Sequence, residues 1–106
     1  MSEKVQEIAP DNFDSFIKSG VSLIDFFADW CGPCRMLAPE VEKVASQMSD
    51  KAHFGKVDID KHQAVAGSYH VTSVPTLILF KDGKEVDRLV GLPDAEALKQ
   101  FVSAAL

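Results

Sequence analysis

The sequence predicts an α/β fold in which a mixed β-sheet carries helices on both faces. Three observations predict it. Short apolar segments alternate with segments of helical period, the last third contains a hairpin followed by one more helix, and 46% of the 106 residues are hydrophobic, enough for the core of one domain. Parallel strands need crossovers and a hairpin does not, so the order strand-helix-strand-helix-strand-helix-strand-strand-helix requires a mixed sheet. We expect a single domain over residues 1–106.

The first elements lie in the first 28 residues. Val5–Ile8 is expected to form a short edge strand. Asp11 and Asn12 are expected to open a helix, since both cap helix N-termini, and Gly20 is a candidate for its C-cap. Val21–Ala28 reads VSLIDFFA, nearly continuous in apolar residues, which is typical of a strand covered on both faces.

From Pro33 the apolar period becomes helical, and apolar side chains share one stripe from Leu37 to Met48. Pro33 suits the first turn of this helix. A strand is expected at about Phe54–Ile59, followed by a short helix around Lys61–Tyr69.

The last third predicts a hairpin and a final helix. Thr76–Phe80 and Glu85–Val90 flank the sequence KDGK, whose Asp-Gly pair favours a tight turn between antiparallel strands. Asp94 then caps a closing helix.

Both cysteines lie in the sequence CGPC, where the buried strand ends and the long helix begins. Unpaired backbone N–H groups and the helix dipole stabilise a thiolate there, so Cys31 is the candidate nucleophile. Cys34 follows one turn later, on the same side and deeper, and is the candidate resolving thiol.

Two other interpretations of the pair stay open. A structural zinc site would need two more ligands, but no second cysteine pair exists and the three histidines are not spaced as ligands, so we expect no metal. The pair could also be buried core cysteines, although Trp30, Gly32 and Pro33 around it are turn and surface types.

Asp25 lies inside the apolar strand segment, flanked by leucine, isoleucine and two phenylalanines. A carboxylate there loses hydration without a neighbouring cation in sequence, so its pKa should rise and make it a proton acceptor near neutrality. The alternative is an aspartate that reaches the strand edge and caps another group.

Charge and hydropathy exclude several functions. The net charge is −5 and the chain has no basic run, so we expect neither nucleic-acid nor membrane binding. No apolar run could span a bilayer, and the N-terminus, MSEKVQEIAPDNF, lacks the features of a signal peptide, which favours the cytoplasm. Two cysteines in a reducing compartment point to metal binding or catalysis rather than to a permanent staple.

The stretches DFFADWCGPCRMLAP and VTSVPTLILFKDGKEVDRLVG resemble the thioredoxin family, and the similarity covers essentially the whole chain. CGPC preceded by Trp is highly specific for that family. The resemblance implies a five-stranded mixed sheet with four helices and reduction of target-protein disulfides by a redox-active Cys31-Cys34 pair. It also implies no bound cofactor and recharging by thioredoxin reductase, an NADPH-dependent flavoprotein. We expect a monomer.

The resemblance also assigns residues. It places Asp25 behind Cys34, which Asp25 deprotonates directly or through water, and Lys56 matches the family's lysine near that aspartate. For Lys56, a stem lying on the sheet with its ammonium in water is an equal alternative. Only about 5% of X–Pro bonds are cis, but the resemblance implies that Pro75 is cis, faces the dithiol and leaves the Val74 backbone free to pair with substrate.

The family's flat apolar contact surface maps onto nine positions. These are Trp30, Gly32, Pro33, Ile59, Val74, Pro75, Val90, Gly91 and Leu92. Such a surface suits weak binding of many extended targets. For Ile59 and Val90, plain core packing is an equal interpretation.

Two residues depart from the commonest family pattern. Phe27 stands where many members have Trp or Tyr, and Arg35 where Lys is frequent, which leaves partner preference open. The Gly32-Pro33 pair supplies no imidazole to stabilise the thiolate further, which favours a reductant. The alternatives are a disulfide oxidase or isomerase on the same fold, and a binding module whose thiols are incidental.

Overall fold

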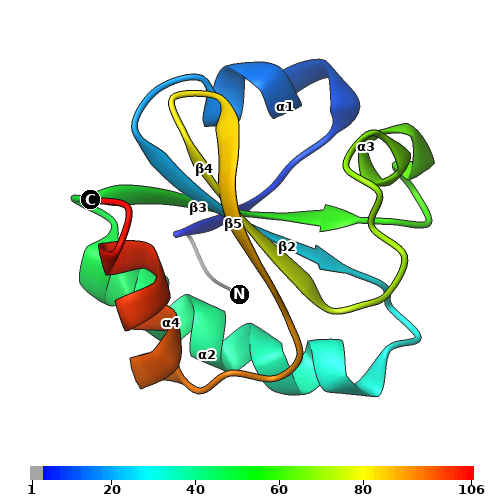
Figure 1. Ribbon diagram of the computed structural model, residues 1–106. Helices are drawn as coiled ribbons and strands as arrows, with labels where there is room; N and C mark the ends of the chain where they lie inside the picture. The colour runs from blue at the N-terminus through cyan, green and yellow to red at the C-terminus, as the bar shows by residue number, and fades with distance from the viewer. Residues whose placement is uncertain (1–3) are drawn as a thin grey trace.

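The computed structural model describes residues 4–106, so the first three residues of the expected domain lie outside the described residues. The nine elements follow the expected order (Figure 1). They are β1 (Val5–Glu7), α1 (Pro10–Ile17), β2 (Val21–Phe27), α2 (Gly32–Met48), β3 (Ala52–Asp58), α3 (Gln63–Ser68), β4 (Thr76–Lys81), β5 (Lys84–Val90) and α4 (Ala95–Ser103). No helix within this described part of the chain is long and apolar enough to cross a bilayer.

The five strands form one mixed sheet in the order β1-β3-β2-β4-β5. β3 pairs in parallel with β1 and β2, whereas β4 pairs antiparallel with β2 and β5. Figure 1 shows α1 and α3 on one side of the sheet and α2 and α4 on the other. This confirms the α/β fold with a mixed sheet covered on both faces.

The central strand β2 is buried on both faces, because its side chains alternate between the two sides of the sheet and helices cover both sides. Leu23 packs in the cluster that contains Leu37 of α2, and Ile24 packs in the cluster that contains Phe13 of α1. Asp25 is two residues after Leu23 and therefore faces α2. This placement sets the aspartate below the start of the helix that carries the cysteines.

The N-terminus of α1 differs from the expectation. The helix begins at Pro10 with Ala9 as N-cap, and Asn12 serves from within the first turn, its side-chain oxygen accepting the Ala9 N–H at 2.9 Å. An asparagine can accept a free backbone N–H from the N-cap position or from the first turn. The residue type alone therefore did not determine where α1 begins. Asp94 caps α4 as expected, accepting the Ala97 N–H at 2.9 Å.

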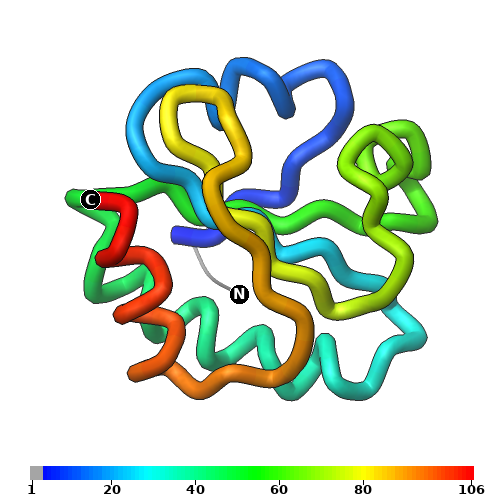
Figure 2. The backbone as a smooth tube through the Cα atoms, in the orientation of Figure 1, coloured from blue at the N-terminus to red at the C-terminus, as the bar shows by residue number. Residues whose placement is uncertain are grey.

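The C-cap of α1 is Lys18, so the expectation for Gly20 was wrong. Gly20 has φ +74° and makes the turn into β2. Its N–H donates to Asp82 Oδ1 at 2.8 Å, and its carbonyl accepts the Asp82 N–H at 2.9 Å. This pair of bonds fastens the β4–β5 turn to the α1–β2 connection, which lie side by side in Figure 2.

Candidate active site

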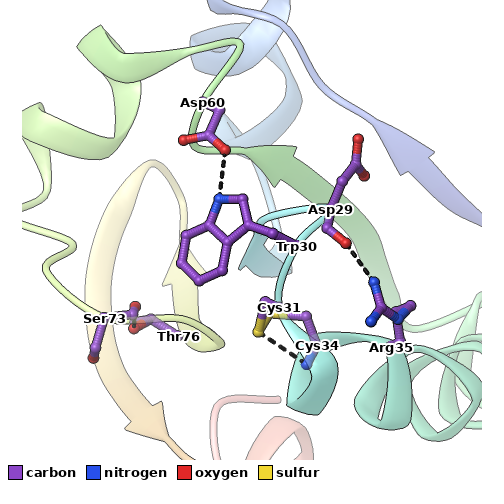
Figure 3. The surroundings of a disulfide bond; sticks show 8 residues. All are labelled: Asp29, Trp30, Cys31, Cys34, Arg35, Asp60, Ser73 and Thr76. Atoms are coloured by element: carbon purple, nitrogen blue, oxygen red, sulfur yellow. Dashed lines mark hydrogen bonds between the residues drawn. A yellow bond between two sulfur atoms is a disulfide. The ribbon is translucent and has the colours of Figure 1, made fainter.

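The two cysteines occupy the first turn of α2. Cys31 is the N-cap, with extended backbone at φ −89° and ψ 111°, and its Sγ accepts the Cys34 N–H at 3.1 Å (Figure 3). The pair forms a disulfide with the two Cα atoms 5.3 Å apart. The helix N-terminus thus directs a backbone donor at the sulfur of Cys31, the group that the sequence predicts as nucleophile.

The disulfide is covered by apolar neighbours. Cys31 and Cys34 are each 4% exposed and cluster with Ala28, and Phe27, Ile59 and Val74 are among the residues that pack against them. The expectation that Cys34 lies deeper is not met in this oxidised form. The bond joins two side chains on one turn beneath the same neighbours, so both have the same exposure.

Asp25 lies beside this pair in a small cavity. The cavity measures about 190 Å³, and Asp25, Cys34 and Lys56 are among the residues that line it. Burial raises the pKa of Asp25 to about 7, and the charge of Lys56 opposes the rise. Asp25 Oδ1 has no hydrogen-bond partner, the only buried side-chain oxygen or nitrogen in residues 4–106 in that state. Asp25 Oδ1 therefore caps no other group, in contrast to the alternative interpretation of this aspartate.

Lys56 is brought next to Asp25 by strand pairing, since the two are partners across β2 and β3. Its side chain is half-buried and lines the cavity, with Nζ 5.6 Å from the centroid of the Phe27 ring. The charge of its ammonium lowers the pKa of Asp25. The departure at position 27 therefore places a phenyl ring against this ammonium.

Arg35 adds a second cation to the lining of the cavity. Its Nη1 donates to the Asp29 carbonyl, which fixes the guanidinium to the loop between β2 and α2 (Figure 3). The other departure from the family pattern thus supplies charge near the dithiol and a contact between α2 and that loop.

The residues of the expected contact surface differ in exposure. Trp30, Val90 and Leu92 are large exposed apolar residues, and Trp30 reaches 67% exposure. Ile59 and Val74 are half-buried and pack against the disulfide cluster, so Ile59 is not a fully buried core residue. Val90 is exposed, which does not fit core packing.

The rest of the expected contact surface includes a cis proline. The Val74–Pro75 peptide bond is cis, the isomer that the family resemblance implies. Pro75 itself is buried, Pro33 is exposed, and Gly32 and Gly91 are intermediate. Pairing of β4 with β5 sets Val90 opposite Thr76, the residue after Pro75.

Sequence reasoning missed Met36, which is 65% exposed on the first turns of α2.

Sequence reasoning also missed two aspartates, one bonded to the Trp30 indole and one bonded to the backbone that carries the first. The Trp30 indole N–H donates to Asp60 Oδ2 at 2.8 Å (Figure 3). Asp58 is 3% exposed, and its Oδ1 accepts the N–H groups of Asp60 and Lys61 at 2.9 and 3.2 Å. An Asp-x-Asp sequence at the end of a strand is a signal for such a turn and could have found it.

Comparison with known proteins decides the family. The thioredoxin family model matches residues 4–104. The chain belongs to the thioredoxin family. It is 54% identical over 99 residues to a thioredoxin of Chlamydia caviae, covering 93% of this chain and 96% of the relative. A thioredoxin of Staphylococcus saprophyticus is 43% identical over 102 residues, with 96% and 98% covered.

Solved thioredoxins have the same fold. A mutant thioredoxin from Halobacterium salinarum superimposes with a TM-score of 0.89 at 42% identity, covering 99% of this chain and 94% of the other. A thioredoxin of Malassezia sympodialis gives 0.85 at 36% identity, with 95% and 90% covered. The thioredoxin fold with its five-stranded sheet and four helices is therefore confirmed.

Family membership and the Cys31–Cys34 pair establish the class of activity. The chain is a thiol–disulfide oxidoreductase with protein-disulfide reductase activity. Thioredoxins use no bound cofactor, because the cysteine pair is itself the redox group and carries two electrons as a dithiol.

Proposed function

We propose that Cys31 is the nucleophile, Cys34 the resolving thiol, Asp25 the proton acceptor and Lys56 the residue that tunes Asp25, all within a single domain spanning residues 1–106. One observation carries this proposal. Asp25 Oδ1 is buried without a hydrogen-bond partner in a cavity that Cys34 and Lys56 also line. A carboxylate that nothing in the fold satisfies is available to take a proton from its neighbour.

The first step is attack on the target. The Cys31 thiolate attacks one sulfur of the target disulfide, so the target S–S bond breaks and a mixed disulfide with Cys31 forms. The departing target thiolate takes a proton from solvent. The backbone N–H of Cys34, which donates to Cys31 Sγ, stabilises the attacking thiolate.

The second step releases the target. The Cys34 thiol gives its proton to the Asp25 carboxylate, and the resulting thiolate attacks Cys31 Sγ. The mixed disulfide breaks, the Cys31–Cys34 disulfide forms, and the second target sulfur leaves as a thiolate that is protonated. Two electrons have then passed from the dithiol to the target. Because the pKa of Asp25 is raised to about 7, the carboxylate can accept and return this proton near neutral pH.

Target binding uses the apolar rim of the disulfide. We assign it to Trp30, Gly32, Pro33, Ile59, Val74, Pro75, Val90, Gly91 and Leu92. The exposure of Trp30, Val90 and Leu92 and the packing of Val74 against the disulfide cluster support this assignment. An extended target segment would pair with the Val74 backbone and rest its side chains on the apolar residues.

Partners and compartment follow from the same chemistry. We propose that disulfide-containing proteins are the targets and that thioredoxin reductase, with NADPH as its electron source, returns the disulfide to the dithiol. We propose that the protein acts as a monomer in the cytoplasm, because a reducing compartment keeps the cysteine pair in its dithiol form. The thioredoxins among the relatives support this proposal.

Trapping the mixed disulfide tests the division of roles. Cys34→Ser should hold a covalent adduct with a disulfide-bonded protein such as insulin, because attack by Cys31 proceeds and release does not. Cys31→Ser is the matched control and should form little adduct. An adduct that forms mainly on Cys31→Ser would reverse the assignment, and adducts on neither variant would contradict it.

The midpoint potential separates a reductant from an oxidase or isomerase. We expect a value near −270 mV, the figure for thioredoxins, whereas a value above roughly −200 mV would indicate an oxidising relative. Equilibration against glutathione or dithiothreitol can be read from the fluorescence of Trp30, the only tryptophan. Retention of full cellular function by a Cys31→Ser, Cys34→Ser double variant would instead support the binding module.

A further inference from the structure

Arg88 joins two segments that lie far apart in the sequence. From β5, its Nε and Nη2 donate to the two carboxylate oxygens of Glu85 at 2.8 and 2.9 Å. The same Nη2 donates to the backbone carbonyl of Tyr69 at 2.7 Å. Glu85 thus holds the planar guanidinium in the orientation that presents Nη2 to a carbonyl just past the end of α3.

The Tyr69 carbonyl stands where the chain turns toward the site. The Tyr69 ring is fixed by the core, with centroids 5.4 Å from Phe13 and 5.2 Å from Phe80. His70 then adopts a left-handed backbone at φ +55°, which redirects the chain into residues 71–75. In Figure 2 this segment runs from α3 across to β4.

The segment ends at the disulfide. Val74 packs against the cluster of Ala28 and the two cysteines. At this end, Thr76 Oγ1 donates to the Ser73 carbonyl at 2.6 Å. Arg88 therefore holds the Tyr69 carbonyl at the beginning of the segment, where the Val71 N–H also donates to the Ala66 carbonyl at 2.9 Å. Thr76 holds the end, and the Val74 backbone lies between the two.

We propose that Arg88 is a positioning residue for protein substrates, which sets the Val74–Pro75 backbone in place by holding the Tyr69 carbonyl. This inference rests on the proposed role of that backbone in target binding. Arg88 belongs neither to the residues lining the Asp25 cavity nor to the disulfide cluster, so the cysteine chemistry does not depend on it. A polypeptide target needs an aligned backbone to pair with, whereas a small disulfide needs only access to Cys31.

The test compares a protein disulfide with a small one in single-turnover oxidation of the reduced protein. Insulin and a small aromatic disulfide are the two substrates, and oxidation is followed by Trp30 fluorescence. For Arg88→Met we expect the second-order rate constant with insulin to fall by about three- to tenfold. This is less than the ~100-fold that a 1 Å misplacement can cost, because the other contacts of the segment remain. The rate with the small disulfide and the midpoint potential should stay unchanged, and Arg88→Lys should recover part of the insulin rate.

Lys84→Met is the matched control, since Lys84 is exposed on the same strand and its loss changes the net charge equally. It should leave both rates unchanged. An unchanged insulin rate in Arg88→Met would overturn the proposal, as would an equal fall for both substrates.

Two further variants keep the outcome decisive. If circular dichroism shows that Arg88→Met does not fold, Glu85→Gln takes its place, because it weakens the Glu85–Arg88 pair and keeps the arginine. Glu85→Gln should lower the rate with insulin alone, by less than Arg88→Met. An unchanged insulin rate in this variant would overturn the proposal. Leu92→Glu tests the contact surface separately. If it slows insulin while Arg88→Met does not, only the role of Arg88 fails. If neither slows insulin, the proposed surface fails as well.

Discussion

Asp25 and Asp58 are two buried aspartates of the same sheet, 4% and 3% exposed, on the adjacent strands β2 and β3. Their surroundings differ in hydrogen bonding. Asp58 Oδ1 accepts two backbone N–H groups, whereas Asp25 Oδ1 has no partner and borders a cavity. The comparison shows that burial alone does not make an acid reactive. The satisfied carboxylate builds a turn, and the unsatisfied one remains available for proton transfer.

At neutral pH, Asp25 should therefore destabilise the fold and Asp58 should stabilise it. Burial raises the pKa of Asp25 from 3.8 to about 7, so the folded state binds this proton more tightly than the unfolded state. The stability linked to Asp25 is fully present below pH 3.8 and is lost as pH rises toward 7. Above that range the ionised, unsatisfied carboxylate destabilises the fold.

The largest expected effect is that of Asp25→Ala. At pH 8 we expect the free energy of unfolding to rise by about 2 to 4 kcal/mol, because the cost of ionising the buried acid disappears. At pH 3.5 the gain should vanish. Urea unfolding at both values measures the difference. A variant less stable than wild type at pH 8 would contradict a buried acid.

Asp58→Ala is the matched substitution at the other aspartate, and it should act in the opposite direction. It leaves the N–H groups of Asp60 and Lys61 without their acceptor, so the free energy of unfolding should fall by about 1 to 3 kcal/mol at pH 8. The same urea titration serves for the measurement. If both substitutions changed the free energy of unfolding in the same direction, the two aspartates would not differ as we propose.

Lys56→Met tests how the charge of Lys56 affects the pKa of Asp25. The ammonium opposes the rise of the Asp25 pKa, so its loss should move the titration of that carboxyl to higher pH. Carboxyl carbon NMR shifts of Asp25 in wild type and variant measure this movement. Lys84→Met is the control for net charge, and an equal movement there would show that no specific contact is involved.

The smallest effect is expected for Asp60→Ala. Its hydrogen bond to the Trp30 indole is exposed, so stability should change by less than about 1 kcal/mol. The indole should nevertheless move more freely, which fluorescence anisotropy decay of Trp30 can detect. Unchanged anisotropy decay would show that Asp60 does not restrain the ring.

Local pattern was enough to predict the order of elements, the cysteines at a strand–helix junction and the burial of Asp25. Periodicity and strand alternation determine these features directly. The role of Asn12 was missed because an asparagine can cap from more than one position. The Arg88–Tyr69 and Gly20–Asp82 contacts join residues 19 and 62 positions apart, and no spacing rule predicts such pairs. Hydrogen-bond satisfaction, which separates Asp25 from Asp58, likewise depends on the folded surroundings.

The rate at which Cys34 resolves a mixed disulfide tests the role of Asp25 most directly. Reduced protein mixed with an aromatic disulfide releases one coloured thiolate when Cys31 attacks and a second when Cys34 attacks, so the second phase isolates the resolving step. At pH 7 we predict that Asp25→Ala slows this phase by about 100-fold, a typical contribution of a general base, while the first phase is unchanged. The two proteins should converge near pH 9, where the thiol ionises unaided. Equal second phases at pH 7 would contradict the account.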